Sequence, residues 1–304
     1  MSSVRIVHTI REVREAVAAQ RAAGRRVGFV PTLGGLHEGH GSLIGRSVAE
    51  CDFTVVSIFV NPLQFGPAED FAKYPRELEV DAAFCEGRGV DLLFAPSQEE
   101  MYPREQRTFV EVTGLTEGLC GRYRPGHFRG VTTVVTKLLM IVLPDVAYFG
   151  QKDGQQLAVV RRMVEDLNIP VVIESVPTVR EADGLAMSTR NRYLSADERR
   201  AATAIYKGLE AARALLASGE RDAEAVRGAV RAALAAEPLL REQYVEVVDA
   251  GDLQPVQKVE GRVMVAVAAF AGTTRLIDNI VYPEERPVPE AAPDPAEPFR
   301  GRVF

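Results

Sequence analysis

The chain has 304 residues, a length that allows one large domain or two smaller ones. Hydrophobic residues make up 46% and charged residues 26%, which is typical of a globular protein and excludes a collagen-like, low-complexity or largely disordered chain. The 36 Lys and Arg residues against 42 Asp and Glu give a net charge of −6, which excludes a global basic field for nucleic acid or an anionic membrane. Any chemistry on phosphate must therefore use a local site.

The three cysteines, Cys51, Cys85 and Cys120, are widely spaced and contain no C-x-x-C pair. This pattern predicts reduced thiols in a cytoplasmic protein, with each cysteine an ordinary packing or surface residue. The N-terminus lacks the basic-then-apolar order of a secretory signal, and no apolar run approaches the ~20 residues of a membrane helix. We therefore expect a cytoplasmic protein that binds neither membrane nor nucleic acid.

Short apolar, β-branched runs alternate with helical patterns along the first part of the chain. The runs predict buried strands at 25–32, 53–60, 90–96, 146–149 and 171–176. The patterns between them predict helices at 12–23, 78–86, 131–142 and 155–167. Because this alternation is typical of βαβ units, we expect an α/β fold with a doubly wound parallel sheet over residues 1–183.

The pattern changes after about residue 183. Ser195 and Glu198 match a capping box, the signature of a helix start. Two Ala-rich helical patterns follow at 197–216 and 222–236, and two alternating segments predict half-buried antiparallel strands at 243–249 and 262–269. We expect a smaller α+β domain over residues 184–282.

The last 22 residues, 283–304, hold six of the 18 prolines. Such a stretch has too little apolar surface to offset the entropy of ordering it. We expect an extended, mobile tail.

The first polar cluster follows the predicted strand at 25–32. His37 and His40, two of only four histidines, come directly after Gly34 and Gly35. The free N–H groups of a helix start favour anions, glycines let the backbone approach a ligand, and imidazoles can contact phosphate oxygens. A satisfied surface pair remains an alternative, whereas zinc proteases space two histidines four apart on a continuous helix. The cluster favours a nucleotide triphosphate.

Two further polar clusters follow later strands, at 61–66 and 150–153. The amides of Asn61 and Gln64 can form hydrogen bonds with a hydroxyl or a carboxylate, and Lys152 can neutralise the charge of a phosphate. Each cluster alone is also compatible with an ordinary turn or surface position.

A fourth polar segment, 180–191, is predicted to be a loop at the domain junction. Its Ser188, Thr189 and Arg190 could close over a triphosphate. Because carboxyl ends of parallel strands meet at one edge of a sheet, the four clusters together predict a single site there.

Several long motifs resemble the pantothenate synthetase family, also called pantoate–β-alanine ligases. They run in order from about residue 4 to residue 282 and are P-T-L-G-G-L-H-E-G-H, S-I-F-V-N-P-L-Q-F, Y-P-R, F-G-Q-K-D, V-P-T-V-R-E-A-D-G-L-A-M-S-T-R-N-R-Y-L and G-T-T-R-L-I-D-N. The resemblance implies a Rossmann-like member of the nucleotidyltransferase superfamily with the HIGH signature, and a homodimer. It also implies a two-step ligation: pantoate attacks the α-phosphorus of ATP to give pantoyl adenylate and pyrophosphate, and β-alanine then displaces AMP.

The same resemblance implies roles for individual positions. His37 and His40 correspond to phosphate-binding residues, with His40 as proton donor, and Lys152 and Arg190 are further catalytic candidates. The implied ATP-binding residues are Leu33, Gly34, Gly35, Leu36, His37, Glu38, Gly39, His40, Gly150, Gln151, Lys152, Asp153, Val179, Met187, Ser188, Thr189 and Arg190.

For the other ligands the resemblance implies a smaller set. Gln64 and Gln156 match pantoate contacts, Asn61 lies beside them, and Asp81 falls near the acidic position associated with Mg²⁺. The implied small-molecule partners are pantoate, β-alanine and ATP.

The sequence departs from the usual family pattern at five positions: Leu33, Gly35, Gly41, Gly154 and Thr189. Glycine inside a helix costs about 1 kcal/mol relative to alanine, so Gly41 predicts a looser first turn after the histidines. Two other functions stay open. One is an adenylyltransferase acting on a phosphorylated substrate, whose product would retain the nucleotide, and the other is a non-catalytic ATP-binding protein.

Overall fold

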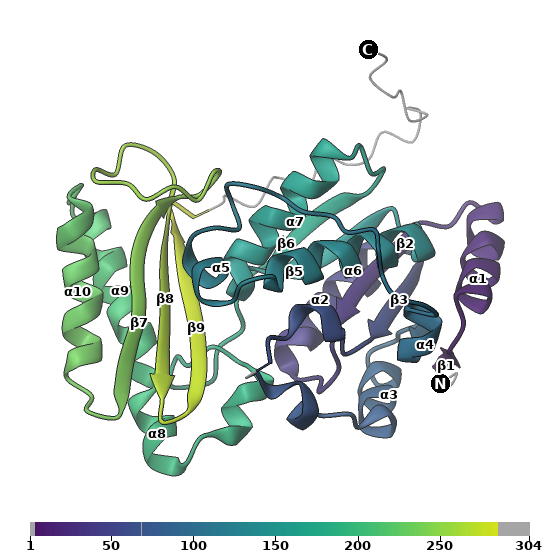
Figure 1. Ribbon diagram of the computed structural model, residues 1–304, viewed down its shortest axis with the longest axis horizontal. Coiled ribbons are helices and arrows are strands. Elements are labelled where there is room, and N and C mark those ends of the chain that lie inside the picture. Colours follow the sequence, from purple (N-terminus) through teal and green to yellow (C-terminus); the bar gives the residue numbers. More distant parts are fainter. Residues whose placement is uncertain (1–3, 68, 285–304) are drawn as a thin grey trace.

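The structure is a computed structural model that describes residues 4–67 and 69–284. It has two lobes, shown in Figure 1: an N-terminal lobe on a six-stranded sheet and a C-terminal lobe on a three-stranded sheet. Beyond Glu284, the predicted mobile tail lies outside the described residues.

The N-terminal lobe contains a parallel sheet with the strand order β1-β4-β3-β2-β5-β6, and all five strand pairs are parallel. Its strands are β1 (Arg5–Val7), β2 (Val27–Thr32), β3 (Phe53–Ile58), β4 (Leu92–Phe94), β5 (Val146–Gly150) and β6 (Val172–Val176). From β2 the chain moves outward to β3 and β4, and it then returns to β5 on the other side of β2. The strand order therefore reverses between β2 and β5, which confirms the doubly wound sheet and marks where ligands bind in such folds.

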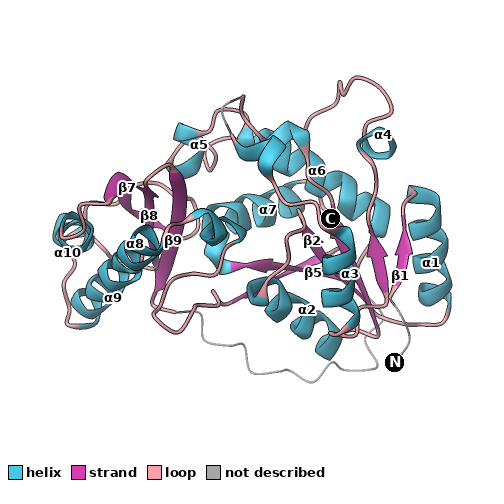
Figure 2. Ribbon diagram, turned by 90° about the horizontal axis from the view of Figure 1, so that it is seen from below, coloured by secondary structure: helices cyan, strands magenta, loops and turns pink. Residues whose placement is uncertain are grey.

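Helices cover both faces of this sheet, as Figure 2 shows for α6 and α7 on one side and α2 and α3 on the other. Phe29 packs in one core with α6 and α7, whereas its neighbour Val30 packs in a second core with α2 and α3, because successive side chains of a strand alternate. The helices of the lobe are α1 (Ile10–Ala22), α2 (Glu38–Glu50), α3 (Leu78–Glu86), α4 (Gln98–Met101), α5 (Leu119–Tyr123), α6 (His127–Val142) and α7 (Gly154–Asp166). Short 3₁₀ turns lie at η1 (Pro62–Gln64), η2 (Asp70–Lys73), η3 (Gln151–Asp153) and η4 (Thr189–Tyr193).

The C-terminal lobe is an antiparallel sheet covered on its outer face by two helices (Figure 1). Val265 packs against α9 and α10, whereas Met264 and Ala266 join the core of the N-terminal lobe. Strand β8 is thus buried on both faces, and the expectation of a half-buried strand is wrong there because the second face packs against the other lobe. The elements are α8 (Ala196–Ala201), α9 (Thr203–Ala217), α10 (Ala223–Ala235), β7 (Leu240–Asp249), β8 (Val263–Ala271) and β9 (Thr274–Tyr282).

Several local features differ from the sequence-based expectation, and two of them concern the strands and the helix after residue 196. Strands β1 and β9 were not expected, since β1 has only three residues and β9 carries the polar Asp278 and Asn279 in its middle. The helical pattern at 197–216 breaks at Ala202, where the Thr203 hydroxyl donates to the Arg200 carbonyl at 2.8 Å. The capping box of Ser195 and Glu198 is confirmed.

The cysteines and the helix lengths agree with the sequence. Cys51, Cys85 and Cys120 are all free thiols, and the last two are buried. Over the described residues, no helix combines the length and the apolar character needed to cross a membrane.

Candidate active site

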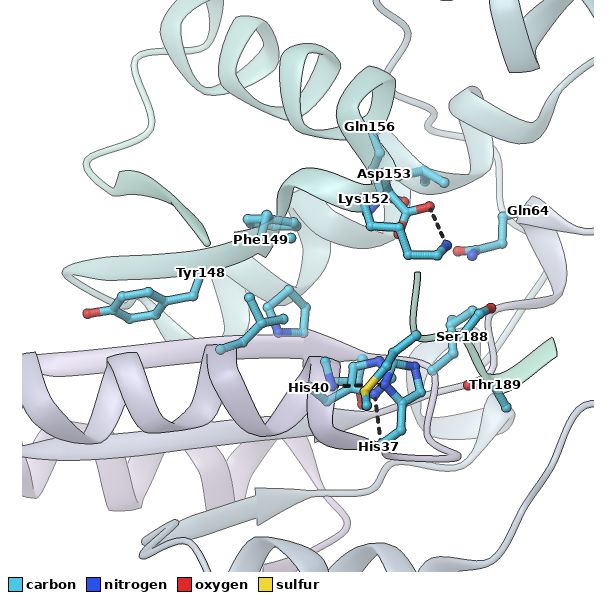
Figure 3. Close-up of a pocket in the computed structure, with 18 of the residues that line it drawn as sticks. His37, His40, Gln64, Tyr148, Phe149, Lys152, Asp153, Gln156, Ser188 and Thr189 are labelled. Carbon is cyan, nitrogen blue, oxygen red and sulfur yellow. Dashed lines mark hydrogen bonds and ion pairs between the residues drawn. The ribbon is translucent and has the colours of Figure 1, made fainter. Parts of the chain in front are cut away.

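A cavity opens at the carboxyl edge of the parallel sheet, between β2 and β5 (Figure 3). It brings together all four polar clusters, as the sequence predicts. Of the candidate residues, the cavity is lined by Leu33, His37, Gly39, His40, Gln64, Gly150, Lys152, Asp153, Gln156, Val179, Met187, Ser188, Thr189 and Arg190. The remaining candidates do not line it: Gly34, Gly35, Leu36, Glu38, Asn61, Asp81 and Gln151.

The two predicted histidines are fixed by backbone hydrogen bonds at the start of α2. Nδ1 of His37 accepts from the Gly39 N–H at 3.1 Å, and Nδ1 of His40 accepts from the His37 N–H at 3.2 Å. A Cβ at Gly39 would lie 2.7 Å from the His37 ring, so glycine is required for this packing. Because Nδ1 is an acceptor in both rings, the neutral form of each carries its proton on Nε2.

Burial also sets the charge of the two rings. It lowers the pKa of His37 to about 4 and the pKa of His40 to about 3, and the nearby Lys152 ammonium adds to both shifts. At neutral pH both imidazoles are therefore neutral and offer Nε2–H as a hydrogen-bond donor. His40 can pass on a proton only after a bound anion has raised its pKa.

Asp81, the predicted magnesium ligand, holds the turn before the histidines. Its side chain is buried, and its two oxygens accept from the N–H groups of Gly35 at 2.9 Å and Leu36 at 2.8 Å. Both oxygens face the backbone rather than the cavity. Among residues 4–67 and 69–284, no group of three His, Cys, Asp or Glu side chains could hold a metal ion. Asp81 thus has a structural role in this turn, and its metal role stays a prediction.

Two more side chains hold the same turn. The Tyr74 hydroxyl donates to the Gly34 carbonyl at 3.3 Å, and the Thr189 hydroxyl donates to the Gly35 carbonyl at 3.1 Å. A Cβ at Gly35 would lie 2.9 Å from the Thr189 methyl group, and φ is +64° at this glycine. Thr189 was expected to contact a triphosphate, but its hydroxyl already donates its proton to the Gly35 carbonyl of this turn.

Gln64 points into the cavity, and Asn61 lies behind it. The fully buried Asn61 donates from Nδ2 to Gln64 Oε1 at 3.1 Å and to the Gly130 carbonyl at 3.1 Å, while its Oδ1 accepts from the Tyr102 hydroxyl at 2.8 Å. Asn61 therefore orients Gln64 and does not itself line the cavity, and its expected contact with a substrate stays a prediction. Because Gln64 Oε1 already accepts from Asn61, the Nε2 group of Gln64 is the part that can donate to a ligand.

The turn that carries Lys152 is held by the other lobe. Nδ2 of Asn279 on β9 donates to the carbonyls of Gln151 at 2.9 Å and Lys152 at 2.8 Å. A Cβ at Gly154 would lie 2.7 Å from Met264 Sδ and 3.1 Å from the Asn279 side chain, so glycine permits this approach. The Lys152 ammonium lies 3.8 Å from the Asp153 carboxylate, and Figure 3 shows both residues across the cavity from the histidines.

Ion pairs tie segment 180–191 to both lobes. Arg180 binds the buried Asp278 of β9 through two hydrogen bonds of 2.5 and 3.1 Å. Burial raises the pKa of Asp278, although the Arg180 guanidinium acts in the opposite direction. Arg190 binds both oxygens of Asp70 in η2 at 3.0 and 3.1 Å. Arg190 thus lines the cavity while paired with Asp70, and its contact with a triphosphate stays a prediction.

Arg124 and His127 also line the cavity, and sequence reasoning missed them. Arg124 donates to both oxygens of Glu69 at 2.6 and 2.7 Å and to His127 Nε2 at 2.9 Å. Because a guanidinium can only donate, His127 Nε2 is an acceptor and Nδ1–H donates to the Gln64 carbonyl at 2.8 Å. Burial, with Arg124 beside it, lowers the pKa of His127 to about 4. The available signal was a rare histidine just before the helical pattern that was predicted to begin at residue 131.

Comparison with known proteins gives one consistent result. A sequence model of the family described as pantoate-beta-alanine ligase matches residues 5–281. A pantothenate synthetase from Heliobacterium modesticaldum is 57% identical over 278 residues, which cover 91% of this chain and 99% of that protein. One from Moorella thermoacetica is 54% identical over 276 residues, with 91% and 98% covered.

Solved structures agree with the sequences. A crystal structure of pantothenate synthetase from Thermus thermophilus superimposes with a TM-score of 0.87 at 48% identity, covering 91% of this chain and 99% of that one. A pantoate-beta-alanine ligase from Francisella tularensis, crystallised with "Beta-gamma ATP" and β-alanine, gives a TM-score of 0.73 at 32% identity, with 91% and 97% covered.

Proposed function

The chain belongs to the pantoate–β-alanine ligase family, and we propose that it condenses pantoate with β-alanine through a pantoyl adenylate, releasing pyrophosphate and then AMP. ATP is the expected co-substrate, since a family member has been crystallised with an ATP ligand and β-alanine. The remaining question is how the residues of this cavity would carry out the two steps.

One arrangement carries the proposal. The start of α2 presents the Nε2–H donors of His37 and His40, and the Lys152 ammonium faces them across the cavity. The dipole of a helix start also favours a phosphate. A triphosphate placed here would meet donors on one side and a cation on the other.

In the first step, a carboxylate oxygen of pantoate forms a bond to the α-phosphorus of ATP. The bond between that phosphorus and the bridging oxygen breaks, and the leaving pyrophosphate takes the electron pair. Negative charge therefore grows on pyrophosphate, where Lys152 and the two imidazoles stabilise it. As this charge grows, Nε2–H of the neutral His40 ring donates to a phosphate oxygen, while Nδ1 continues to accept from the His37 N–H.

Pantoate carries a carboxylate, two hydroxyls and a pair of methyl groups on one carbon. The Nε2 donors of Gln64 and the amide of Gln156 suit the polar groups. An apolar wall suits the methyl groups, and it consists of Phe59, Val131, Val134, Val135 and Leu138. Holding the carboxylate against the α-phosphorus in this way removes much of the entropic barrier to attack.

In the second step, the amine of β-alanine attacks the pantoyl carbonyl carbon. The bond from that carbon to the phosphate oxygen breaks, AMP leaves with the electron pair, and the nitrogen loses a proton to give the amide. Water would destroy the adenylate, so the bridges from Arg180 to Asp278 and from Arg190 to Asp70 help by holding segment 180–191 over the cavity.

The proposal includes three further points. Mg²⁺ enters with ATP and is held mainly by phosphate oxygens and water, which matches the preference of this ion for few protein ligands. The protein acts in the cytoplasm, as its free thiols suggest. It works as a homodimer.

The decisive experiment measures products. Protein supplied with pantoate, β-alanine, ATP and Mg²⁺ is expected to release AMP and pyrophosphate in equal amounts, and to exchange labelled pyrophosphate into ATP when pantoate alone is present. Release of ADP would contradict the adenylate route. A product that retains AMP would favour the adenylyltransferase alternative.

A variant of His40 tests the role of its Nε2. In His40→Asn the side-chain oxygen can replace Nδ1 as acceptor of the His37 N–H, so the helix start is kept while the Nε2 donor is lost. We expect turnover to fall by at least about 10²-fold, as in Lys152→Ala, with little change in Tm. Near-normal turnover would reject the role of His40.

A further inference from the structure

A cavity of about 320 Å³ lies between the two lobes and shares no lining residue with the candidate active site. On one side it is lined by α7 of the N-terminal lobe. On the other side it is lined by the end of β9 and by residues of the segment 250–262, which joins β7 to β8 (Figure 1). We call it the α7 cavity. Gln151 and Gly154 also line it, so the turn that carries Lys152 borders both cavities.

The lining of the α7 cavity is basic. Its described residues include three arginines, Arg161, Arg162 and Arg262, and one acid, Glu165. Arg162 binds Asp166 at 2.8 Å, so the half-buried Arg161 and Arg262 are the cations that matter most for a ligand. In a chain with a net charge of −6, a cavity with this lining favours an anionic ligand.

Apolar side chains complete the lining of the α7 cavity. They are Leu157, Ala158, Leu253, Met264 and Val281. Guanidinium groups next to apolar side chains suit a peptide that carries both carboxylates and small apolar residues. A compact inorganic anion would use only the arginines.

The chain leaves the C-terminal sheet at this cavity. Val281 of β9 lines it, and the next residue, Tyr282, is the Cα partner of Val263 at the start of β8. Arg262 directly precedes Val263, so it lies where the chain leaves β9. The residues after Glu284 therefore begin close to the arginines of the α7 cavity.

The sequence after Glu284 has the complementary charge. Segment 285–297 contains four acids, one arginine and four prolines, and it lies beyond the residues that match the family model. Glu284 itself binds Arg213 of α9. At no more than about 3.6 Å per residue, Glu285 lies within about 14 Å of Val281, so the acids can reach the cavity. The prolines restrict the unbound segment, which reduces the entropy lost on binding.

We propose that the α7 cavity binds the acidic segment 285–297 of the same chain, with carboxylates of the segment on Arg161 and Arg262. These two arginines belong to different lobes, so the bound segment ties the C-terminal lobe to α7. Because Gln151 and Gly154 line the same cavity, this tie also stabilises the docked position on which the Lys152 turn depends.

A neutral-tail variant of the full-length chain tests the charge contact. It combines Glu285→Gln, Glu290→Gln, Asp294→Asn and Glu297→Gln, and it keeps the length and the prolines of the segment. At low ionic strength we expect its Tm to be about 1 to 3 °C lower than that of the unmodified protein. The difference should vanish near 1 M NaCl, where the Debye length is about 3 Å. Equal Tm values at low salt would overturn the proposal.

Substitution of the two arginines shows where the segment binds. Arg161→Gln and Arg262→Gln should each lower Tm in the unmodified protein but have little further effect in the neutral-tail variant, whose carboxylates are already lost. Arg241→Gln is the matched control, because Arg241 contacts the Phe270 ring and does not line the cavity. Its effect should be the same with either tail. Effects of Arg161→Gln and Arg262→Gln that simply add to that of the neutral tail would overturn the assignment.

Backbone NMR relaxation measures the contact directly. We expect order parameters near 0.8 for residues 285–297 in the unmodified protein, and values below about 0.6 in the neutral-tail variant and after substitution of both Arg161 and Arg262. Values below about 0.6 in the unmodified protein at low salt would overturn the proposal.

Inorganic phosphate at fixed ionic strength tests a small anion as the occupant. Because the acids of the tail compete with it, an Arg161-dependent rise in Tm should be larger in the neutral-tail variant. An equal rise with both tails that is lost in Arg161→Gln would assign the cavity to a small anion and overturn the proposal. None of these measurements uses the ligase reaction, so their outcome is independent of the proposed function.

Discussion

The two turns that line the cavity from β2 and β5 differ in what holds them. Turn 33–40 follows β2 and is fixed mainly within its own lobe, by Asp81 of α3 and by the ring-to-backbone bonds of the histidines. Turn 150–153 follows β5 and is fixed across the interface, by Asn279 of β9. The two turns line one cavity but depend on different parts of the chain.

The positions of the histidines and of Lys152 therefore depend on different parts of the fold. The histidines should stay in place as long as the N-terminal lobe folds, whereas Lys152 also needs the C-terminal lobe to be docked. The bridge from Arg180 to Asp278 is a second tie from the site to β9. Docking of the lobes would therefore complete the cationic side of the cavity, and variants on each side can test this.

Of the two supports, breaking the local one is expected to have the larger effect. In Asp81→Asn, a buried carboxylate that accepts two backbone N–H bonds is replaced by an amide that can accept well at only one atom. Hydrogen bonds to a charged group contribute about 1.5–3 kcal/mol, so we expect kcat/KM for ATP to fall about 10- to 100-fold and Tm to fall. Steady-state kinetics and thermal unfolding are the measurements.

Asp91→Asn is the control for this variant. Asp91 accepts from the Thr54 N–H at 2.8 Å at the opposite edge of the same sheet, so its loss should lower Tm without changing KM for ATP. A shift of the Mg²⁺ concentration needed for half activity in Asp81→Asn would contradict a purely structural role and support the metal role.

A smaller effect is expected from breaking the support across the interface. Asn279→Ala leaves the carbonyls of Gln151 and Lys152 without their donor, and each neutral hydrogen bond contributes about 1 kcal/mol. We expect the rate of pyrophosphate exchange to fall about fivefold to tenfold through a lower kcat, because Lys152 is less well placed. Asn279→Asp, which keeps the size but not the donor, should be at least as slow.

Asp249→Ala serves as the control in the C-terminal lobe. Asp249 accepts from the N–H groups of Gly251 at 2.7 Å and Asp252 at 3.1 Å in a turn outside the cavities, so this variant should lose stability but not exchange rate. If it slows exchange as much as Asn279→Ala does, general weakening of the lobe explains both results.

The smallest expected effect is on stability at low pH. Burial lowers the pKa of His37 and His127 to about 4 and of His40 to about 3, whereas an unfolded histidine titrates near 6.5. Below about pH 6.5 the unfolded chain binds more protons than the folded one, so this stability is present above that pH and is lost as the pH falls toward 4. Thermal unfolding between pH 7 and pH 4 should show Tm falling steadily as these rings take up protons.

His127→Gln tests that explanation. Glutamine can donate to the Gln64 carbonyl and accept from Arg124, as His127 does, but it does not titrate. The loss of Tm at low pH should become smaller, with His8→Gln, at an exposed histidine, as the matched control. An unchanged loss in His127→Gln would rule out this ring as a source.

The sequence alone predicted the sheet, the edge at which the cavity opens and many of the polar residues that line it. The apolar runs were sufficient to predict strands β2 and β5, because a parallel strand that is buried on both faces is apolar along its whole length. The placement of His37, His40 and Lys152 followed from their positions just after those strands. Strand β9 was missed because Asp278 and Asn279 interrupt its apolar pattern, and their polarity is explained only by partners more than 90 residues away, Arg180 and Lys152.

The sequence by itself thus determined which chemical groups reach the site, since local patterns set where strands end and helices begin. Only the tertiary structure decided what each group does. Asp81, Asn61 and Thr189 match functional positions in sequence, but each uses its polar atoms on another part of the protein. The physical reason is that a buried polar group must be paired, and its partners come from segments that are distant in the chain.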